Sequence, residues 1–168
     1  MLHSFKGILP ELGVDVFLVD SAELIGDVKI GTRSSIWFNV VIRGDVNFIR
    51  VGARTNIQDG AVIHVTHEKH STWIGDDVTI AHNVTLHGCR IGHRCLIGMG
   101  AIIMDGAEVA DDAMVAAGSL VTPGTQIPSG TLYAGSPARY KRDLKDEEIT
   151  GLKQSAENYL RYVDAYKS

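Results

Sequence analysis

Aliphatic residues recur at every sixth position along most of the chain. The longest unbroken run comprises Ile91, Ile97, Ile103, Val109, Val115, Val121 and Ile127. Small residues stand four positions after each of the first six: Cys95, Ala101, Ala107, Ala113, Ser119 and Thr125. A six-residue period predicts one short strand and one tight turn per hexad, with the aliphatic side chain inside a prism. Three hexads make one coil, and coils stack about 4.8 Å apart as parallel strands.

The same period runs through the earlier part of the chain in three other phases. These phases are Leu18, Leu24, Ile30, Ile36 and Ile42, then Val51, Ile57 and Ile63, and then Ile74, Ile80 and Leu86. They extend the prism to about six coils over residues 12–130. Nine residues separate Ile42 from Val51, and eleven separate Ile63 from Ile74. We therefore expect the segments DVNFIR and VTHEKHST to leave the prism as loops at its corners.

Counting coils past these insertions brings polar side chains into columns. Three aliphatic residues one coil apart share a face, and the residues that follow them directly are Arg43, His64 and His87. His64 and His87 should therefore be neighbours on the outside of the prism. On the preceding face, Asp59 and His82 stand two positions after stacked isoleucines. One chain cannot readily bring His82 to the other two histidines, but a neighbouring chain around a threefold axis could.

Three histidines with an open fourth position are the ligand set of a catalytic zinc site. Such a site lowers the pKa of bound water from about 15.7 to about 7 and supplies hydroxide at neutral pH. Zinc, cobalt and ferrous iron all accept these ligands, and the sequence does not choose between them. The alternative is that outward histidines on a parallel sheet simply form hydrogen bonds with their neighbours.

Four segments together resemble one known family. RGD at 43–45, NIQDG at 56–60, His64 and HNVTLHG at 82–88 are similar, in this order, to the γ-class carbonic anhydrases. The resemblance covers roughly residues 10–140. It implies a mainly β fold, a left-handed parallel β-helix of hexapeptide repeats with a C-terminal α-helix. It also implies a homotrimer that hydrates carbon dioxide to bicarbonate at its subunit interfaces, with a zinc ion, or Fe²⁺ or Co²⁺, held by His64, His82 and His87.

The same resemblance implies roles for six further residues. Gln58 would orient the metal-bound hydroxide or water, Asn56 would line the pocket, and Tyr133 would reach it on a looser match. Arg43, Asp45 and Asp59 would form an ion-pair network at the interface, with Arg43 also near the bicarbonate position. The alternative for this network is a purely structural pairing that fixes the trimer.

The loop after His64 departs from the most active members of the family. Those members carry a longer acidic loop with a glutamate that shuttles protons. Here VTHEKHST contains only Glu68, with His67 and His70 beside it. Two alternatives therefore stay open: a metal-stabilised scaffold or complex subunit without activity, and a hexapeptide acyltransferase that uses a histidine as general base.

Composition narrows the class of protein. A net charge of −4 and a pI near 5.9 argue against nucleic-acid binding. No apolar run approaches the roughly 18 residues of a membrane span, and no leader-like segment is visible, so we expect a cytoplasmic protein without membrane contact. The two cysteines, Cys89 and Cys95, are too few for a disulfide framework, and we expect buried free thiols.

The C-terminal part changes from the six-residue period to a helical one. Apolar residues recur at helical spacing over about 146–166: Ile149, Leu152, Ala156, Tyr159, Leu160 and Val163. Acidic residues at 146–148 favour a helix start there. We therefore divide the chain into a β-helix domain, residues 1–140, and a packed helix, residues 141–168, with Pro137 marking the turn between them.

Overall fold

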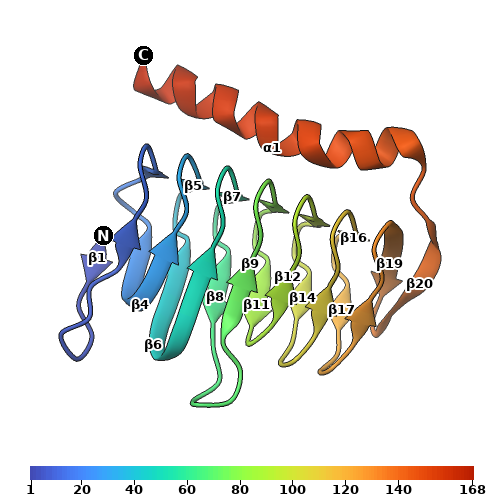
Figure 1. Cartoon of the computed structure of the whole chain (residues 1–168), viewed down its shortest axis with the longest axis horizontal. Coiled ribbons are helices and arrows are strands. Elements are labelled where there is room, and N and C mark those ends of the chain that lie inside the picture. Colours follow the sequence, from blue (N-terminus) through green and yellow to red (C-terminus); the bar gives the residue numbers. More distant parts are fainter.

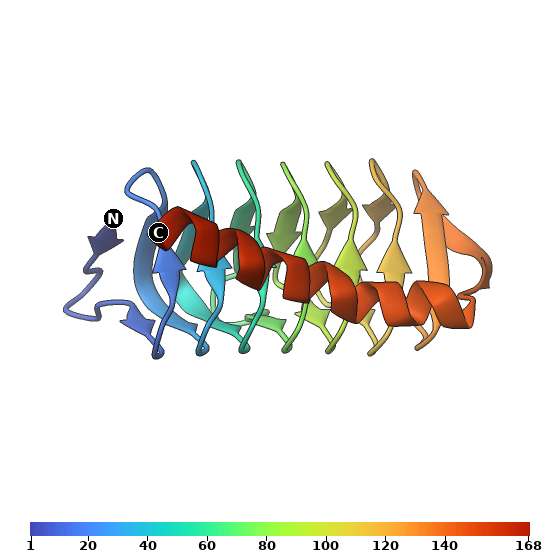
Figure 2. The ribbon, with the colours of Figure 1, turned by 90° about the horizontal axis from the view of Figure 1, so that it is seen from above.

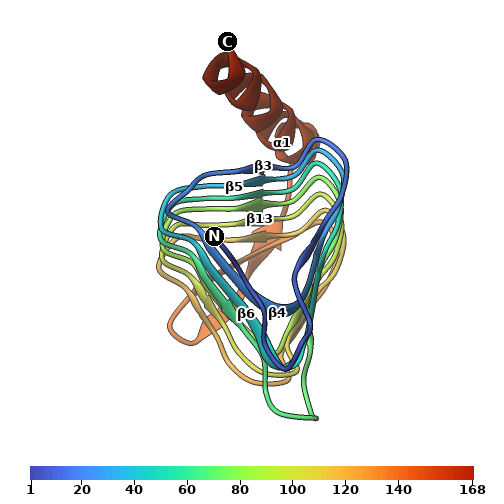
Figure 3. The same ribbon diagram turned by 90° about the vertical axis from the view of Figure 1, so that its left-hand side faces the viewer.

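The aliphatic residues of the repeat form the interior of a parallel β-helix. The computed structural model describes all 168 residues. Each of the seven aliphatic side chains from Ile91 to Ile127 is at most 2% exposed. Seen from the N-terminal end, the coils run counterclockwise as they recede, so the β-helix is left-handed (Figure 3). The parallel β-helix expected from the repeat is thus confirmed. Burial of these side chains stabilises it, because apolar surface is removed from water at every coil.

The strands belong to two sheets. The twelve-stranded sheet contains β1 (Leu2–His3), β2 (Glu11–Leu12), β4 (Glu23–Ile30), β6 (Val41–Val51), β8 (Val62–His64), β9 (Thr72–Ile74), β11 (Thr85–His87), β12 (Arg90–Ile91), β14 (Ile102–Ile103), β15 (Glu108–Val109), β17 (Leu120–Val121) and β18 (Gln126–Ile127). The eight-stranded sheet contains β3 (Phe17–Leu18), β5 (Ser35–Ile36), β7 (Asn56–Ile57), β10 (Thr79–Ile80), β13 (Leu96–Ile97), β16 (Met114–Val115), β19 (Thr131–Gly135) and β20 (Ala138–Asp143).

These sheets make the three faces of the prism. The eight-stranded sheet forms the helix face, along which α1 (Asp146–Lys167) runs across the coils (Figures 1 and 2). The twelve-stranded sheet turns a corner within β4 and β6 and so supplies two faces. The histidine face consists of the first half of β6 with β8, β11, β14 and β17. The open face consists of the second half of β6 with β9, β12, β15 and β18.

One of the two expected loops does not leave the prism. Residues 45–50 continue β6 around the corner, but only Ile49 and Arg50 of this segment pair with β4. Residues 45–48 stand opposite the single residue Asp27, where the register shifts between Gly26 and Val28. The prediction of a DVNFIR loop was therefore wrong in that the segment is part of a strand. The extra residues of β6 are taken up at the corner as a bulge, because β4 has no matching insertion. Residues 65–71 do form a loop between β8 and β9, closed by a bridge between Thr66 and His70. This loop protrudes below the prism in Figure 1.

The chain leaves the prism through an antiparallel hairpin before the helix begins. β19 and β20 pair across Ser136 and Pro137, so the boundary expected at 140/141 falls inside β20. Pro137 marks the turn between these strands and not a turn directly into the helix. Glu148 accepts a hydrogen bond from the Lys145 backbone nitrogen at 2.9 Å and pairs with Arg142, which fixes the start of α1. No helix in the structure combines the length and apolar character that crossing a membrane needs.

Helix α1 buries its apolar stripe on the helix face. Leu152, Ala156 and Val163 are buried, as the helical spacing predicts. Near its C-terminal end, Tyr159 packs edge-on against Trp37 with ring centroids 5.4 Å apart. Contacts with β5 and β10 hold the helix across several coils. The helix therefore shields one face of the prism from solvent.

Both cysteines are free and buried, as expected from their number. Burial raises the pKa of the Cys95 thiol to about 12. At pH 8 its thiolate fraction is therefore about one in ten thousand, and thiolate is the reactive form. We expect a disulfide reagent at pH 8 to label neither thiol in the native protein and both after unfolding in guanidinium. Rapid labelling of the native protein would contradict this burial.

Candidate metal centre

Strands β8 and β11 place His64 and His87 side by side on the histidine face. The two residues are register partners in the parallel pairing, one coil apart. Their preceding neighbours, Ile63 and Leu86, are fully buried, so alternation turns both imidazoles outward. His64 Nδ1 lies 3.2 Å from His87 Nε2. The coil counting from sequence is confirmed for this pair.

Each of these imidazoles is held by a carboxylate through its other ring nitrogen. His64 Nε2 lies 3.0 Å from Asp45 Oδ1, and His87 Nδ1 lies 2.7 Å from Asp105 Oδ1. An ionised carboxylate only accepts hydrogen bonds, so both of these ring nitrogens carry hydrogen. In neutral imidazoles, the two nitrogens that face each other then carry lone pairs and no hydrogen. Such a contact is stable only with a cation between the rings, either a proton or a metal ion.

The spacing of the two facing nitrogens suits zinc. Zn–N bonds of about 2.0–2.1 Å in tetrahedral geometry place two ligand nitrogens about 3.3 Å apart. The observed separation is 3.2 Å. Carboxylates behind ligating histidines are also the usual second layer of such sites, since they fix the tautomer and the ring orientation. The donor set therefore fits a divalent metal ion that accepts nitrogen ligands.

Asp45 lies between His64 and Arg43. Burial opposes its ionisation, but hydrogen bonds from His64 and Arg43 outweigh burial and hold the pKa of Asp45 below its usual value. The Arg43 guanidinium is half exposed, so part of it remains open to an anion. The expected pairing of Arg43 with Asp45 is present within one chain, whereas Asp59 joins neither of them and instead binds His82.

Asp105 is the functional residue that the sequence reasoning missed. It accepts hydrogen bonds from His87 Nδ1 and from Thr66 Oγ1, the latter at 2.9 Å. Burial raises the pKa of Asp105, but these hydrogen bonds lower it further than burial raises it. Gly88 makes room for the carboxylate, because a Cβ there would lie 2.3 Å from Asp105 Oδ1. Counting one more coil would have found it, since Asp105 stands two residues after Ile103, the next aliphatic residue above Leu86.

His82 lies at the corner between the helix face and the histidine face. Its Nδ1 is 2.9 Å from Asp59 Oδ2, which leaves Nε2 free, and the side chain is half exposed. His82 forms no hydrogen bond with His64 or His87, and no group of three possible metal ligands converges within the chain. The single chain therefore brings together two of the three predicted ligands and presents the third on another edge.

Asn56 and Gln58 lie on the helix face and are buried. Gln58 Nε2 donates to Asn56 Oδ1 at 3.0 Å. Neither residue forms a hydrogen bond with His64 or His87 within the chain. Gln58 directly precedes Asp59, so it shares the edge that carries His82.

Tyr133 lies at the far end of the prism. It is the register partner of Val115 in β16, three coils beyond Ile80 in β10. Its ring packs near that of Tyr140, with centroids 6.2 Å apart. Within one chain Tyr133 therefore caps the core and does not approach the histidines, and its pocket role stays a prediction.

The loop after His64 holds its two histidines differently. His67 and Glu68 are exposed, with His67 Nε2 4.0 Å from Glu68 Oε1. His70 is partly buried and lies over Gly106, where its Cε1 would be 3.2 Å from a Cβ. Neither histidine forms a hydrogen bond with the pair on the histidine face.

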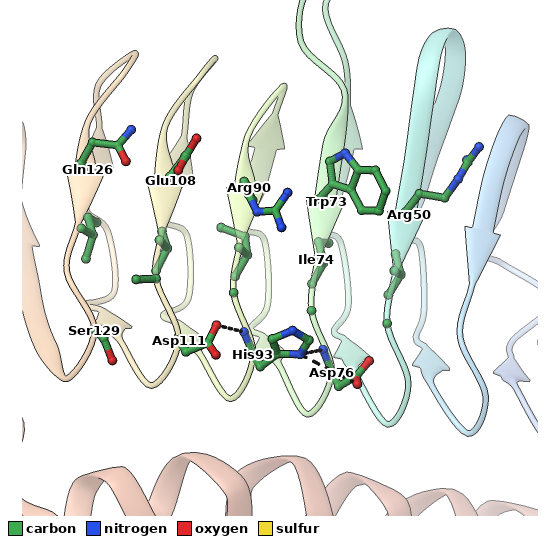
Figure 4. A pocket seen from close by; sticks show the side chains of 18 residues that line it. Arg50, Trp73, Ile74, Asp76, Arg90, His93, Glu108, Asp111, Gln126 and Ser129 are labelled. Atoms are coloured by element: carbon green, nitrogen blue, oxygen red, sulfur yellow. Dashed lines mark hydrogen bonds and ion pairs between the residues drawn. The ribbon is translucent and has the colours of Figure 1, made fainter.

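The largest groove of the molecule lies elsewhere, on the open face. It has a volume of about 690 Å³. Figure 4 shows it between one row of outward side chains, Arg50, Trp73, Arg90, Glu108 and Gln126, and a second row at the corner, Asp76, His93, Asp111 and Ser129. None of the predicted site residues lines it. The candidate centre is thus a surface feature of one chain and not an enclosed pocket.

The fold and these residues define a hexapeptide-repeat protein, and comparison with known proteins gives its family. Residues 88–123 match the family described as bacterial transferase hexapeptide (six repeats). Protein YrdA of Escherichia coli is 48% identical over 99% of this chain and 94% of its own length. Gamma carbonic anhydrase 2 of Arabidopsis thaliana, a mitochondrial protein, is 48% identical over 95% of this chain and 59% of its own length.

A solved structure shows the same fold throughout. The hexapeptide transferase family protein of Anaplasma phagocytophilum superimposes with a TM-score of 0.95 at 44% identity, covering 99% of this chain and 98% of its own. Together with the family match, this structure identifies the fold as that of hexapeptide-repeat proteins. The chain belongs to the γ-class carbonic anhydrase family of hexapeptide-repeat proteins.

The arrangement of carboxylates predicts which ring nitrogens carry hydrogen. In metal-free protein, nitrogen-15 NMR should show hydrogen on Nδ1 of His87 and on Nε2 of His64, with any additional proton shared between the two facing nitrogens. Asp105→Asn should disturb the His87 signals, and the control Asp111→Asn on the open face should not. A His87 protonated only on Nε2 would contradict the facing lone pairs.

Proposed function

We propose that this protein is a metal-dependent carbonic anhydrase that reversibly hydrates carbon dioxide to bicarbonate at the subunit interfaces of a homotrimer. The observation that carries the proposal is the pair of facing nitrogens of His64 and His87, each imidazole fixed by a carboxylate. His82, held in the same way by Asp59, supplies the third ligand from the neighbouring subunit. Three carboxylate-bound histidines on two edges of one chain form a complete site only when copies of the chain meet.

The outer surface of the histidine face supports an assembly there. Its outward row, one residue per coil, comprises Val41, Val62, Thr85, Ile102 and Leu120. Val62 and Ile102 are each 41% exposed in the single chain. The equivalent row on the open face is mostly charged or polar, and the helix face is already covered by α1. Burial against a second copy would therefore remove most apolar surface from water at the histidine face, where this row lies beside the two histidines.

The protein groups divide the chemistry between them. Zinc held by three neutral imidazoles would lower the pKa of coordinated water to about 7, and Fe²⁺ or Co²⁺ fits the same donors. Asp45, Asp59 and Asp105 hold the imidazoles in the tautomers that ligation needs. Arg43 offers a half-exposed guanidinium to the bicarbonate anion. The reaction releases one proton for each bicarbonate, and solvent reaches the exposed edge of the centre to accept it.

Two other functions fit the fold. A metal-stabilised scaffold would keep the same ligands without turnover, and the short loop with Glu68 exposed agrees with that alternative. An acyltransferase would need one histidine as general base and no metal, which leaves the three histidine–carboxylate pairs without a purpose. We place the enzyme in the cytoplasm, where its two free thiols would remain reduced.

Activity measured on defined metal forms tests the proposal. Zinc-, cobalt- and anaerobically iron-loaded protein should hydrate carbon dioxide, and at least one form should lose activity by a factor of about 100 or more in His82→Ala because one ligand is missing. The control His93→Ala, on the open face, should keep full activity. Bound metal without turnover in any form would favour the scaffold, and the absence of metal binding would favour the acyltransferase.

A further inference from the structure

A chain of hydrogen bonds joins helix α1 to Gln58. Ser155 Oγ of the helix lies 3.0 Å from Thr79 Oγ1, and Asn56 Nδ2 donates to the same Thr79 oxygen at 3.0 Å. Gln58 Nε2 donates in turn to Asn56 Oδ1 at 3.0 Å. Thr79, Asn56 and Gln58 are all at most 5% exposed. A polar chain in such a buried position is costly unless each member is satisfied, so it has a defined geometry.

One backbone carbonyl determines which groups donate and which accept in this chain of hydrogen bonds. Asn56 Nδ2 also donates to Val78 O at 3.3 Å, and a carbonyl oxygen only accepts. The Asn56 amide cannot turn over without placing its oxygen against that carbonyl. Its oxygen therefore faces Gln58, and Gln58 must present its NH₂ group to Asn56.

This direction leaves the carbonyl oxygen of Gln58 as the free end. Gln58 Oε1 has no hydrogen-bond partner within the protein. Every fully buried side-chain oxygen or nitrogen does have a partner, so Gln58 Oε1 is not fully buried. Solvent therefore reaches this oxygen. Gln58 directly precedes Asp59, which holds His82, so the free acceptor lies on the edge that carries the third ligand.

We propose that Thr79 and Ser155 are positioning residues that hold the Gln58 amide with its carbonyl oxygen toward the metal centre, where it accepts a hydrogen bond from the reacting water. This inference rests on the proposed function. It makes α1 part of the catalytic apparatus, because the helix supplies the hydroxyl group at the start of the chain. Thr79 Oγ1 accepts the hydrogen bond from Asn56, and either hydroxyl group can donate in its contact with Ser155.

Thr79→Val tests the proposal, because valine keeps the shape and removes the hydroxyl group. The chain has only three glutamines, so the side-chain NH₂ signals of Gln58 can be assigned by NMR. In the wild-type protein, metal-free or loaded, one Gln58 N–H should be shifted by its hydrogen bond and exchange slowly. Thr79→Val should speed this exchange and lower kcat about fivefold with KM unchanged, and Thr79→Ser should restore both.

Ser155→Ala should move the Gln58 signals in the same direction by a smaller amount. Thr150→Val, on the same helix but bonded to its own turn through Asp146 O, should leave them unchanged. Wild-type Gln58 signals typical of a free amide, or a Thr79→Val protein with wild-type signals and kcat, would overturn the inference. Wild-type protein that is inactive with every metal would overturn the proposed function instead. The NMR signals would still test whether the hydrogen bonds from Ser155 to Gln58 hold the Gln58 amide.

Discussion

The stacking of aliphatic residues inside the prism fixes which side chains meet outside it. Ile63 lies on Leu86 in adjacent coils, and His64 and His87 follow them directly. A slip of one residue would turn both histidines into the core and both aliphatic residues into solvent. Such a slip is opposed at every coil by the cost of exposing a fully buried side chain. The position of the candidate centre is thus determined by the hydrophobic core.

Carboxylates then convert a pair of neighbouring histidines into a site for a cation. Without Asp45 and Asp105, either imidazole could turn or change tautomer and donate a hydrogen bond to the other. With them, two lone pairs face each other at 3.2 Å. Gly88 and the coil spacing make this arrangement possible, since the Asp105 carboxylate occupies the space that a side chain at 88 would fill.

The sequence predicted the fold and the central pair because both depend on a strict period. It did not predict that residues 45–50 stay within a strand, since a bulge inside a strand and a loop insert residues into the repeat in the same way. Asp105 was missed because the counting stopped at the histidines. The orientation of the Gln58 amide depends on Thr79 and on a helix residue far along the chain, and no local pattern connects them.

The comparisons show the family to which this chain belongs. The geometry shows that one chain alone does not bring the three predicted metal ligands together. One chain presents His64 and His87 on one face and His82 on another edge, so the central claim is that metal is shared between subunits. The three faces of the prism support this claim because only one of them suits contact with a second copy. The helix face is covered by α1, the open face is polar, and the histidine face is apolar beside the two histidines.

Complementation between two inactive variants tests that claim most directly. His64→Ala and His82→Ala proteins should each bind little zinc and show little activity. If they are co-expressed in equal amounts and mix at random, each mixed trimer has one interface with all three histidines, and the mixture should recover about a quarter of the wild-type zinc content and activity. No recovery in mixed trimers, or full zinc content in either variant alone, would contradict a site shared between subunits.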